Sequence, residues 1–212
     1  MVASRGTVQV IITIAVFVWA VMLILQGVRL EFEFLRPYSV AVGTAVLALN
    51  AYDKWLWKIP WLRYVPKRPP NISGTWKGEL HSEYIDPKTG EKWPTIQVFL
   101  VVEQTASSIS IRQITSESGS QSLTASLEKN AGMWVVTYSY LNEPRLRHQE
   151  RSPMHVGTGI LNIHGSPPTS IDGQYWTTRD SKGEVEFSRH SKKIYTKFED
   201  AQQDEKLADS SC

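Results

Sequence analysis

The sequence predicts a membrane-anchored all-β protein, with two N-terminal transmembrane helices followed by a compact eight-stranded antiparallel up-and-down β-barrel. Two observations lead to this prediction. The first is a long apolar run without any charge near the N-terminus, followed by a second, shorter apolar run. The second is a change in the pattern of hydrophobic residues after residue 72, where eight short runs of alternating hydrophobicity are separated by turn-forming residues.

The first predicted membrane helix covers about residues 8–26. Between Val8 and Leu25 only Gln9 and Thr13 are polar. At about 1.5 Å per residue this run can cross a hydrocarbon core of roughly 30 Å. A cleaved signal peptide is the alternative, but the run is long for one, and QGVRL follows it instead of a small-x-small cleavage site. We therefore expect an uncleaved anchor.

The second predicted membrane helix covers about residues 37–54. It is shorter and contains the polar residue Asn50. Its far end is rich in aromatic residues, as expected where a helix meets the membrane surface, and these are Tyr52, Trp55, Trp57 and Trp61. The alternative is a single span followed by a helix that lies in the membrane interface.

The distribution of basic residues predicts the orientation. Arg5 precedes the first helix, and Lys54, Lys58, Arg63, Lys67 and Arg68 follow the second. In the loop between the helices, Arg29 and Arg36 are balanced by Glu31 and Glu33. Because basic residues favour the cytoplasmic side, we expect both termini and the barrel to be cytoplasmic.

The rest of the chain is predicted to consist of a proline-rich linker at 59–72, a ligand-binding β-barrel at 73–196, and a polar, disordered tail at 197–212. The eight expected strands are roughly 73–84, 95–103, 107–115, 119–128, 133–141, 154–163, 170–179 and 184–190. Nearly all the connections have hairpin length, so each strand should pair with its neighbours in the chain. A two-sheet sandwich is the alternative.

Strand phase predicts which side chains point into the barrel. In IDGQYWTTRD (171–180), Tyr175, Thr177 and Arg179 share the face of Ile171. In an up-and-down barrel these residues converge at one mouth with others from the fifth and sixth strands, and the two longest loops, 85–94 and 142–153, open there. The candidate ligand-binding residues are Tyr138, Tyr140, Arg145, Arg147, Arg151, His155, Tyr175, Thr177 and Arg179.

Aromatic rings beside arginine and threonine suit a ligand with flat bases and phosphates. The alternative is that tyrosine and arginine at a barrel rim only bridge the apolar interior and water.

Other classes of function receive little support. A net charge of +2 gives no strong attraction to a nucleic acid polymer. The only cysteine is Cys212, so no internal disulfide can form. The five histidines show no metal-binding spacing, and neither a G-x-S-x-G elbow nor a P-loop is present. We therefore expect neither an enzyme nor a metal site, and no resident cofactor.

Three strings, NISGTWKGEL (71–80), WVVTYSYLNEP (134–144) and GQYWTTRDSKGEVEF (173–187), together with the order helix, helix, barrel, resemble the two-transmembrane, β-strand-rich effectors of CBASS, the cyclic-oligonucleotide-based antiphage signalling of bacteria. The resemblance covers residues 8–190. It implies that a phage-activated nucleotidyltransferase makes a cyclic dinucleotide that the barrel binds. The protein then forms homo-oligomers and disrupts the bilayer of the bacterial inner membrane, which causes abortive infection.

Two other functions stay open from the sequence. A membrane-tethered, lipocalin-like carrier of a small apolar ligand would need an open, apolar interior, whereas Trp134, Tyr138, Tyr140 and Tyr175 should largely fill this one. A structural subunit of a membrane complex is the other alternative. A neighbouring nucleotidyltransferase gene would support only the effector.

Overall fold

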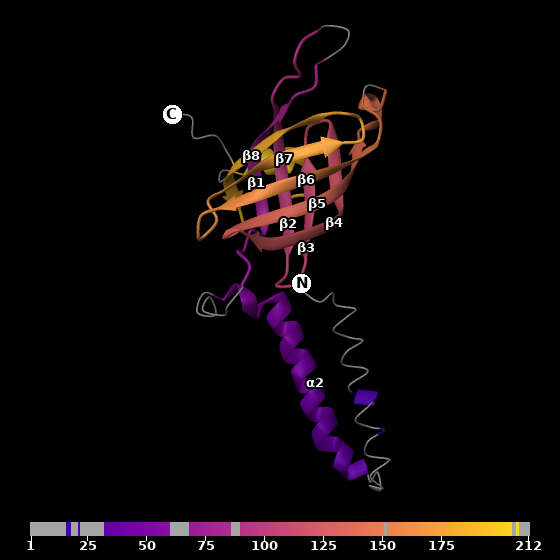
Figure 1. Ribbon diagram of the computed structural model, residues 1–212, viewed down its shortest axis with the longest axis vertical. Coiled ribbons are helices and arrows are strands. Elements are labelled where there is room, and N and C mark those ends of the chain that lie inside the picture. The colour runs from indigo at the N-terminus through magenta and orange to yellow at the C-terminus, as the bar shows by residue number, and fades with distance from the viewer. Residues whose placement is uncertain are drawn as a thin grey trace. The chain divides into compact units, whose positions relative to one another are not determined.

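The computed structural model describes residues 16, 17, 21, 32–59, 68–85, 90–150, 152–204 and 207. The N-terminal part contains helix α2 (Phe32–Lys54) and the short 3₁₀ helix η1 (Leu56–Lys58). The C-terminal part is a β-barrel (Figure 1).

Helix α2 contains the second predicted membrane segment and begins five residues before it, at Phe32 instead of residue 37. No residue between Phe32 and Arg36 breaks a helix, so the helical backbone extends upstream of Pro37. Within the described residues, no helix combines the length and the apolar character needed to cross a bilayer. Except for Val16, Phe17 and Val21, the first predicted span lies outside the described residues.

The barrel is closed, and its eight antiparallel strands are paired in chain order from β1 to β8, with β1 also pairing with β8. This confirms the predicted up-and-down barrel and excludes the sandwich. The strands are β1 (Gly74–Ser82), β2 (Ile96–Gln104), β3 (Ile109–Ile114), β4 (Ser118–Asn130), β5 (Met133–Pro144), β6 (His155–His164), β7 (Ser170–Thr177) and β8 (Lys182–Ser191).

The barrel interior is filled by alternate residues of the strands, as the phase of the alternation predicts. Its buried apolar side chains include Trp76, Val98, Leu100, Ile111, Val136, Leu161, Ile171, Val185 and Phe187. Their burial supplies most of the driving force for folding. The Trp76 indole nitrogen donates a hydrogen bond of 3.0 Å to the Ile72 carbonyl, and the ring stacks on His190 with centroids 4.3 Å apart. These contacts fill the end of the lumen at which β1 begins.

Three tyrosines form a layer across the lumen, which we call the tyrosine layer. Each stands opposite a glycine of the next strand, in the pairs Tyr138 with Gly159, Tyr140 with Gly157, and Tyr175 with Gly183. A Cβ atom on Gly159 would lie 2.5 Å from the Tyr138 ring, and one on Gly183 would lie 2.9 Å from the Tyr175 ring. The rings therefore occupy the space that a side chain at these glycine positions would need.

The expectation of a disordered tail is wrong for the described residues after Lys197. The C-terminal segment, which we define as residues 195–204 and 207, contains the short helix α3 (Phe198–Gln202). Its apolar side chains cover the outer face of β2 and β3, where Phe198, Ala201 and Leu207 cluster with Phe99, Val101 and Ile114. Asp204 accepts hydrogen bonds of 2.7 Å from Ser191 Oγ and from the Tyr195 hydroxyl. This segment is part of the barrel domain.

Candidate functional site

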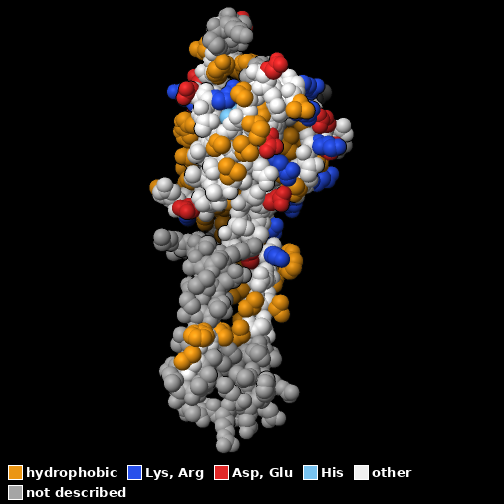
Figure 2. Space-filling model, turned by 90° about the vertical axis from the view of Figure 1, so that its right-hand side faces the viewer, with side chains coloured by type: hydrophobic (Ala, Val, Ile, Leu, Met, Phe, Trp, Pro, Cys, Tyr) orange, Lys and Arg blue, Asp and Glu red, His pale blue; other side chains and the backbone are white. Residues whose placement is uncertain are grey.

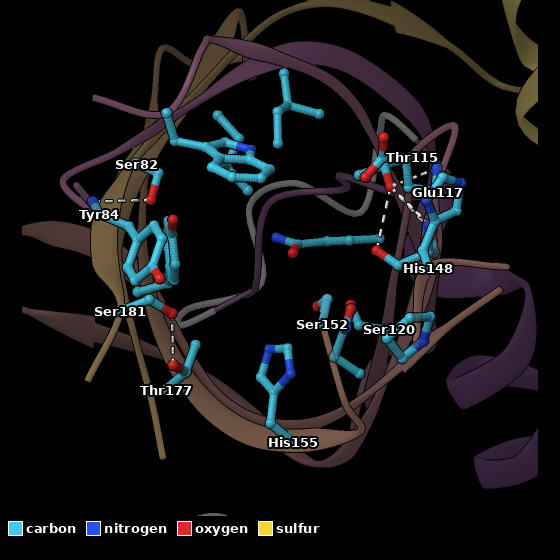
Figure 3. A pocket seen from close by; sticks show the side chains of 18 of the residues that line it. Ser82, Tyr84, Thr115, Glu117, Ser120, His148, Ser152, His155, Thr177 and Ser181 are labelled. Carbon is cyan, nitrogen blue, oxygen red and sulfur yellow. Dashed lines mark hydrogen bonds between the residues drawn. The ribbon is translucent and has the colours of Figure 1, made fainter. Parts of the chain in front are cut away.

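The antiparallel topology brings four connections to one end of the barrel, which we call the mouth. These are the loops β1–β2, β3–β4, β5–β6 and β7–β8. A cavity of about 480 Å³ opens at the mouth, above the tyrosine layer. Its lining side chains come from opposite walls of the barrel and point toward the centre (Figure 3). This size is within the usual range for a small-ligand site.

The tyrosine layer forms the floor of the cavity. Tyr140 and Tyr175 line it, and Tyr138 is buried below, with its ring centroid 5.6 Å from that of Tyr140. The Tyr138 hydroxyl accepts a hydrogen bond of 2.8 Å from Gln113 Nε2, and Gln113 itself reaches the cavity. Burial is the main reason that the pKa of all three phenols is raised. The floor is therefore uncharged at neutral pH and offers aromatic faces with hydroxyl groups.

Arg179 lies at the mouth end of β7 and is held by its neighbours. Its Nη1 donates a hydrogen bond of 2.6 Å to Ser152 Oγ, and its backbone N–H donates to Thr177 Oγ1 over 3.2 Å. The hydroxyls of Thr177 and Ser181 are 2.6 Å apart, and Asp180 adopts a left-handed conformation with φ 56° that closes the turn. The β7–β8 turn thus fixes the backbone that carries the guanidinium.

His155 stands beside this guanidinium. Its Nδ1 is 2.9 Å from the Pro153 carbonyl, which is an acceptor and so favours a proton on that nitrogen. Nη1 of Arg179 lies 3.5 Å from the same ring nitrogen. Burial, and then the positive charge of Arg179, lower the pKa of His155 below its ordinary value, although the bond to Pro153 opposes this. His155 is therefore neutral at pH 7 in the absence of a bound anion.

The opposite wall of the cavity is rich in hydroxyl and amide groups. In the β3–β4 turn, Thr115 Oγ1 accepts hydrogen bonds from the backbone N–H groups of Glu117 and Ser118, at 3.2 and 2.9 Å. Thr115 and Glu117 lie across the cavity from Thr177 and Ser181 in Figure 3. The strand residues Ser120 and Asn142 also line the cavity. A ligand in this cavity would meet donors and acceptors on both sides and aromatic rings beneath.

The structure separates the predicted site residues into two groups. Tyr140, His155, Tyr175, Thr177 and Arg179 line one cavity, and Tyr138 supports its floor. Arg145 does not line it, because its Nη2 pairs at 3.0 Å with Glu199 of the C-terminal segment. Arg147 is exposed outside the cavity and contacts His148 Nε2 at 3.0 Å, whereas His148 is part of the lining. Arg151 lies outside the described residues.

Strand phase missed two aromatic residues at the mouth, Tyr84 and Trp93. Their rings meet edge to face with centroids 6.1 Å apart. The backbone N–H of Trp93 donates a hydrogen bond of 3.0 Å to the backbone carbonyl of Tyr84. Both line the cavity. The signal in the sequence was that one aromatic residue lies on each side of DPKTG (86–90), a run of residues typical of turns. Gln113, Asn142, Ser152 and Ser181 were also missed, because polar residues near strand ends give no distinctive pattern.

Over the described ranges, no three His, Cys, Asp or Glu side chains form a group that could hold a metal ion. The chemical character of the mouth comes from the guanidinium, the hydroxyls and the tyrosine rings described above.

Comparison with known proteins places this architecture among receptor domains. The family model described as "Cap15, cyclic dinucleotide receptor domain" matches residues 67–189, which include the tyrosine layer, Arg179 and most of the barrel. A relative in Staphylococcus schleiferi, named CD-NTase-associated protein 15, is 25% identical over 152 residues. The alignment covers 72% of this chain and 77% of that protein.

Proposed function

Since the chain belongs to the Cap15 cyclic dinucleotide receptor domain family, we propose that its barrel binds a cyclic dinucleotide in the cavity at the mouth and that the protein acts as a CBASS effector. The observation that carries this proposal is the cavity of about 480 Å³, with tyrosine rings as its floor and one fixed guanidinium at its side. The matched family is described as a receptor and not as an enzyme.

Each part of the cavity suits one part of such a ligand. Tyr140 and Tyr175 offer ring faces for stacking of a base, since base–aromatic stacking depends little on base identity. Arg179 offers N–H donors to a phosphate, and charge-assisted bonds of this type are among the stronger hydrogen bonds in proteins. The amides of Gln113 and Asn142 and the hydroxyls of the opposite wall can bind base edges and ribose hydroxyls.

The lipocalin-like carrier fits the structure less well. Below the tyrosine layer, the lumen is filled by side chains such as Val136, Leu161 and Phe187. The cavity above the layer carries hydroxyl, amide and imidazole groups beside apolar side chains such as Leu80 and Ile96, and an apolar ligand would remove these polar groups from water without giving them partners.

The first test removes the guanidinium. We expect Arg179→Ala to weaken cyclic dinucleotide binding about ten- to a hundredfold, because a charge-assisted contact contributes roughly 1.5–3 kcal/mol. Isothermal titration of the purified protein with a panel of 3′,3′-linked cyclic dinucleotides measures the change. The matched control is Arg112→Ala, because Arg112 pairs with Glu103 at 3.5 Å on the outside of the barrel. Equal affinities of wild type and Arg179→Ala would remove Arg179 from the site.

The second test uses the pKa of His155. That pKa lies below the ordinary value of 6.5 in the free protein, and a nearby phosphate would raise it in the complex. Binding should therefore take up a proton, and affinity should increase as the pH falls from about 7.5 toward 5.5, then level off once free His155 is itself protonated. Titrations in buffers with different ionisation enthalpies measure the uptake.

His155→Gln should remove most of this pH dependence, and the exposed control His164→Gln should retain it. His148 also lines the cavity, and His148→Gln is therefore a second control. An affinity that does not change with pH in the wild type would show that no phosphate binds beside His155.

We further propose that the protein is anchored in the bacterial inner membrane with its barrel in the cytoplasm, and that ligand binding causes homo-oligomerisation and membrane disruption. The uncharged run from Val8 to Leu25 and the basic residues after Tyr52 support the anchor and its orientation. We then expect a reporter that works only in the cytoplasm to be active when it is fused after Cys212. Activity of a periplasm-specific reporter at this position would contradict the proposed orientation.

A further inference from the structure

The outer surface of the barrel carries a large face without charge. We define the uncharged face as the outward side chains of residues 121–126, 137–141, 156–160 and 174–176, on β4, β5, β6 and β7. None of the residues in these ranges is charged, although charged residues make up 21% of the chain. On soluble proteins, surfaces of this kind are common at contacts with other proteins.

The strand register makes this face continuous. Thr124 of β4 pairs with Ser139 of β5, Ser139 with Thr158 of β6, and Thr158 with Trp176 of β7. The hydroxyls of Thr124 and Ser139 are 2.8 Å apart on this surface. Large apolar side chains lie within and beside this row, with exposed fractions of 42% for Trp176 at its end, and of 62% for Leu123, 39% for Val156 and 37% for Ile160 beside it.

The other two outer sectors of the barrel are different. On β2 and β3, the apolar residues Phe99, Val101 and Ile114 are already covered by the C-terminal segment. On β8 and β1, outward positions carry charges, and Glu79, Glu186 and Asp172 stand next to one another in the register across β1, β8 and β7. Figure 2 shows that hydrophobic side chains also reach the surface of the barrel at several places between polar ones.

We propose that the uncharged face is the contact through which a second copy of this chain docks, with the two copies related by a two-fold axis. In such a contact a face meets its own copy, so a charge near the axis would oppose an identical charge. The absence of charge over four strands meets this condition, and the acidic row on β7, β8 and β1 does not. Trp176, Leu123 and Ile160 would supply the apolar area that the contact buries.

The same strands connect this face with the cavity. Side chains alternate along a strand, so Tyr140, His155 and Tyr175 point inward from the strands whose outward residues form the face. A ligand that moves these inward side chains therefore acts on the backbone that presents the docking residues. This inference rests on the proposed function, since it names the surface for the proposed oligomerisation.

Cysteine cross-linking of the full chain in detergent tests the contact. In a Cys212→Ser background, Thr158→Cys and Thr137→Cys place single thiols within the face, and Ser188→Cys places one on the outside of β8 as the matched control. With a 3′,3′-cyclic dinucleotide that binds by titration, we expect disulfide-linked dimers from at least one of the first two positions and not from the third. Equal cross-linking at all three, or only at residue 188, would overturn the proposal.

A second variant separates docking from ligand binding. Ile160→Lys should abolish assembly, measured by light scattering, and leave nucleotide affinity within about twofold of wild type; Ser188→Lys should alter neither. If Ile160→Lys assembles normally but no longer binds lipid vesicles, the uncharged face contacts lipid and the proposal is overturned. If no cyclic dinucleotide binds, the proposed function fails. Cross-linking at increasing protein concentration without ligand then decides the docking face alone.

Discussion

Removal of the residues after Thr196 is expected to lower the free energy of unfolding of the barrel by about 3–5 kcal/mol, a large part of the stability of a domain of this size. The physical reason is lost burial. Phe198, Ala201 and Leu207 are at most 9% exposed, and the Phe198 ring meets Phe99 edge to face with centroids 5.2 Å apart. Truncation also exposes the apolar outer side chains of β2 and β3 to water.

Urea unfolding of barrel fragments that begin at residue 68 measures this effect. The fragment that ends at 196 should unfold at a clearly lower denaturant concentration than the one that ends at 212. Phe198→Ala in the longer fragment should reproduce much of the loss, whereas the matched control Ile194→Ala should cost little, because Ile194 is 44% exposed. If both fragments unfold at the same midpoint, the C-terminal segment does not stabilise the barrel.

Replacement of Gly159 by alanine is expected to destabilise the barrel by about 1–3 kcal/mol and to weaken ligand binding. The added Cβ would lie 2.5 Å from ring atoms of Tyr138. That ring is buried and its hydroxyl is bound to Gln113, so it cannot move away without breaking this hydrogen bond. A displaced Tyr138 would push Tyr140 toward the cavity and reduce the space for the ligand.

Gly119→Ala is the matched control, since no atom lies within 4 Å of the position its Cβ would occupy. It should change stability by no more than about 0.5 kcal/mol. Thermal unfolding and titration with the same nucleotide measure both consequences. Equal effects of the two substitutions would show that the packing of Tyr138 against Gly159 is not restrictive.

The strands and their order could be predicted because local pattern and topology agree in this chain. Alternation along 170–179 assigned Tyr175, Thr177 and Arg179 to the inner face, although neither face of that run is purely apolar. Hairpin-length loops then left nearest-neighbour pairing as the simplest arrangement, which placed these residues at the same mouth as His155.

The C-terminal segment could not be predicted by the same reasoning. A five-residue helix is too short to show a clear 3.6-residue period, and acidic residues surround its few apolar ones. The signal was in another part of the chain, in the continuous apolar run from Val98 to Val102. A strand with apolar residues on both faces needs a cover on each, and this run therefore indicated an additional layer.

The loop residues at the mouth were also beyond strand patterns. Arg145 and Arg147 lie beside and within the 3₁₀ helix η3 (Leu146–His148), where the direction of a side chain does not follow a period of two. Their positions depend on the groups that they contact, as Arg145 shows by pairing with Glu199 outside the cavity. Charge in the β5–β6 loop was therefore a poor guide to the lining, whereas His148 from the same loop reaches the cavity.

The tyrosine layer has a consequence for the heat of binding. It divides the lumen into a lower part filled by apolar side chains and an upper chamber whose walls carry hydroxyls, amides and one guanidinium beside apolar side chains such as Leu80, Trp93 and Ile96. A cyclic dinucleotide that enters the chamber would exchange its hydration shell for polar contacts, and its bases would cover the tyrosine rings and the apolar side chains of the wall. Association should therefore combine a favourable enthalpy from the polar contacts with a negative change in heat capacity, because burial of apolar surface lowers the heat capacity. Titrations at several temperatures measure both quantities.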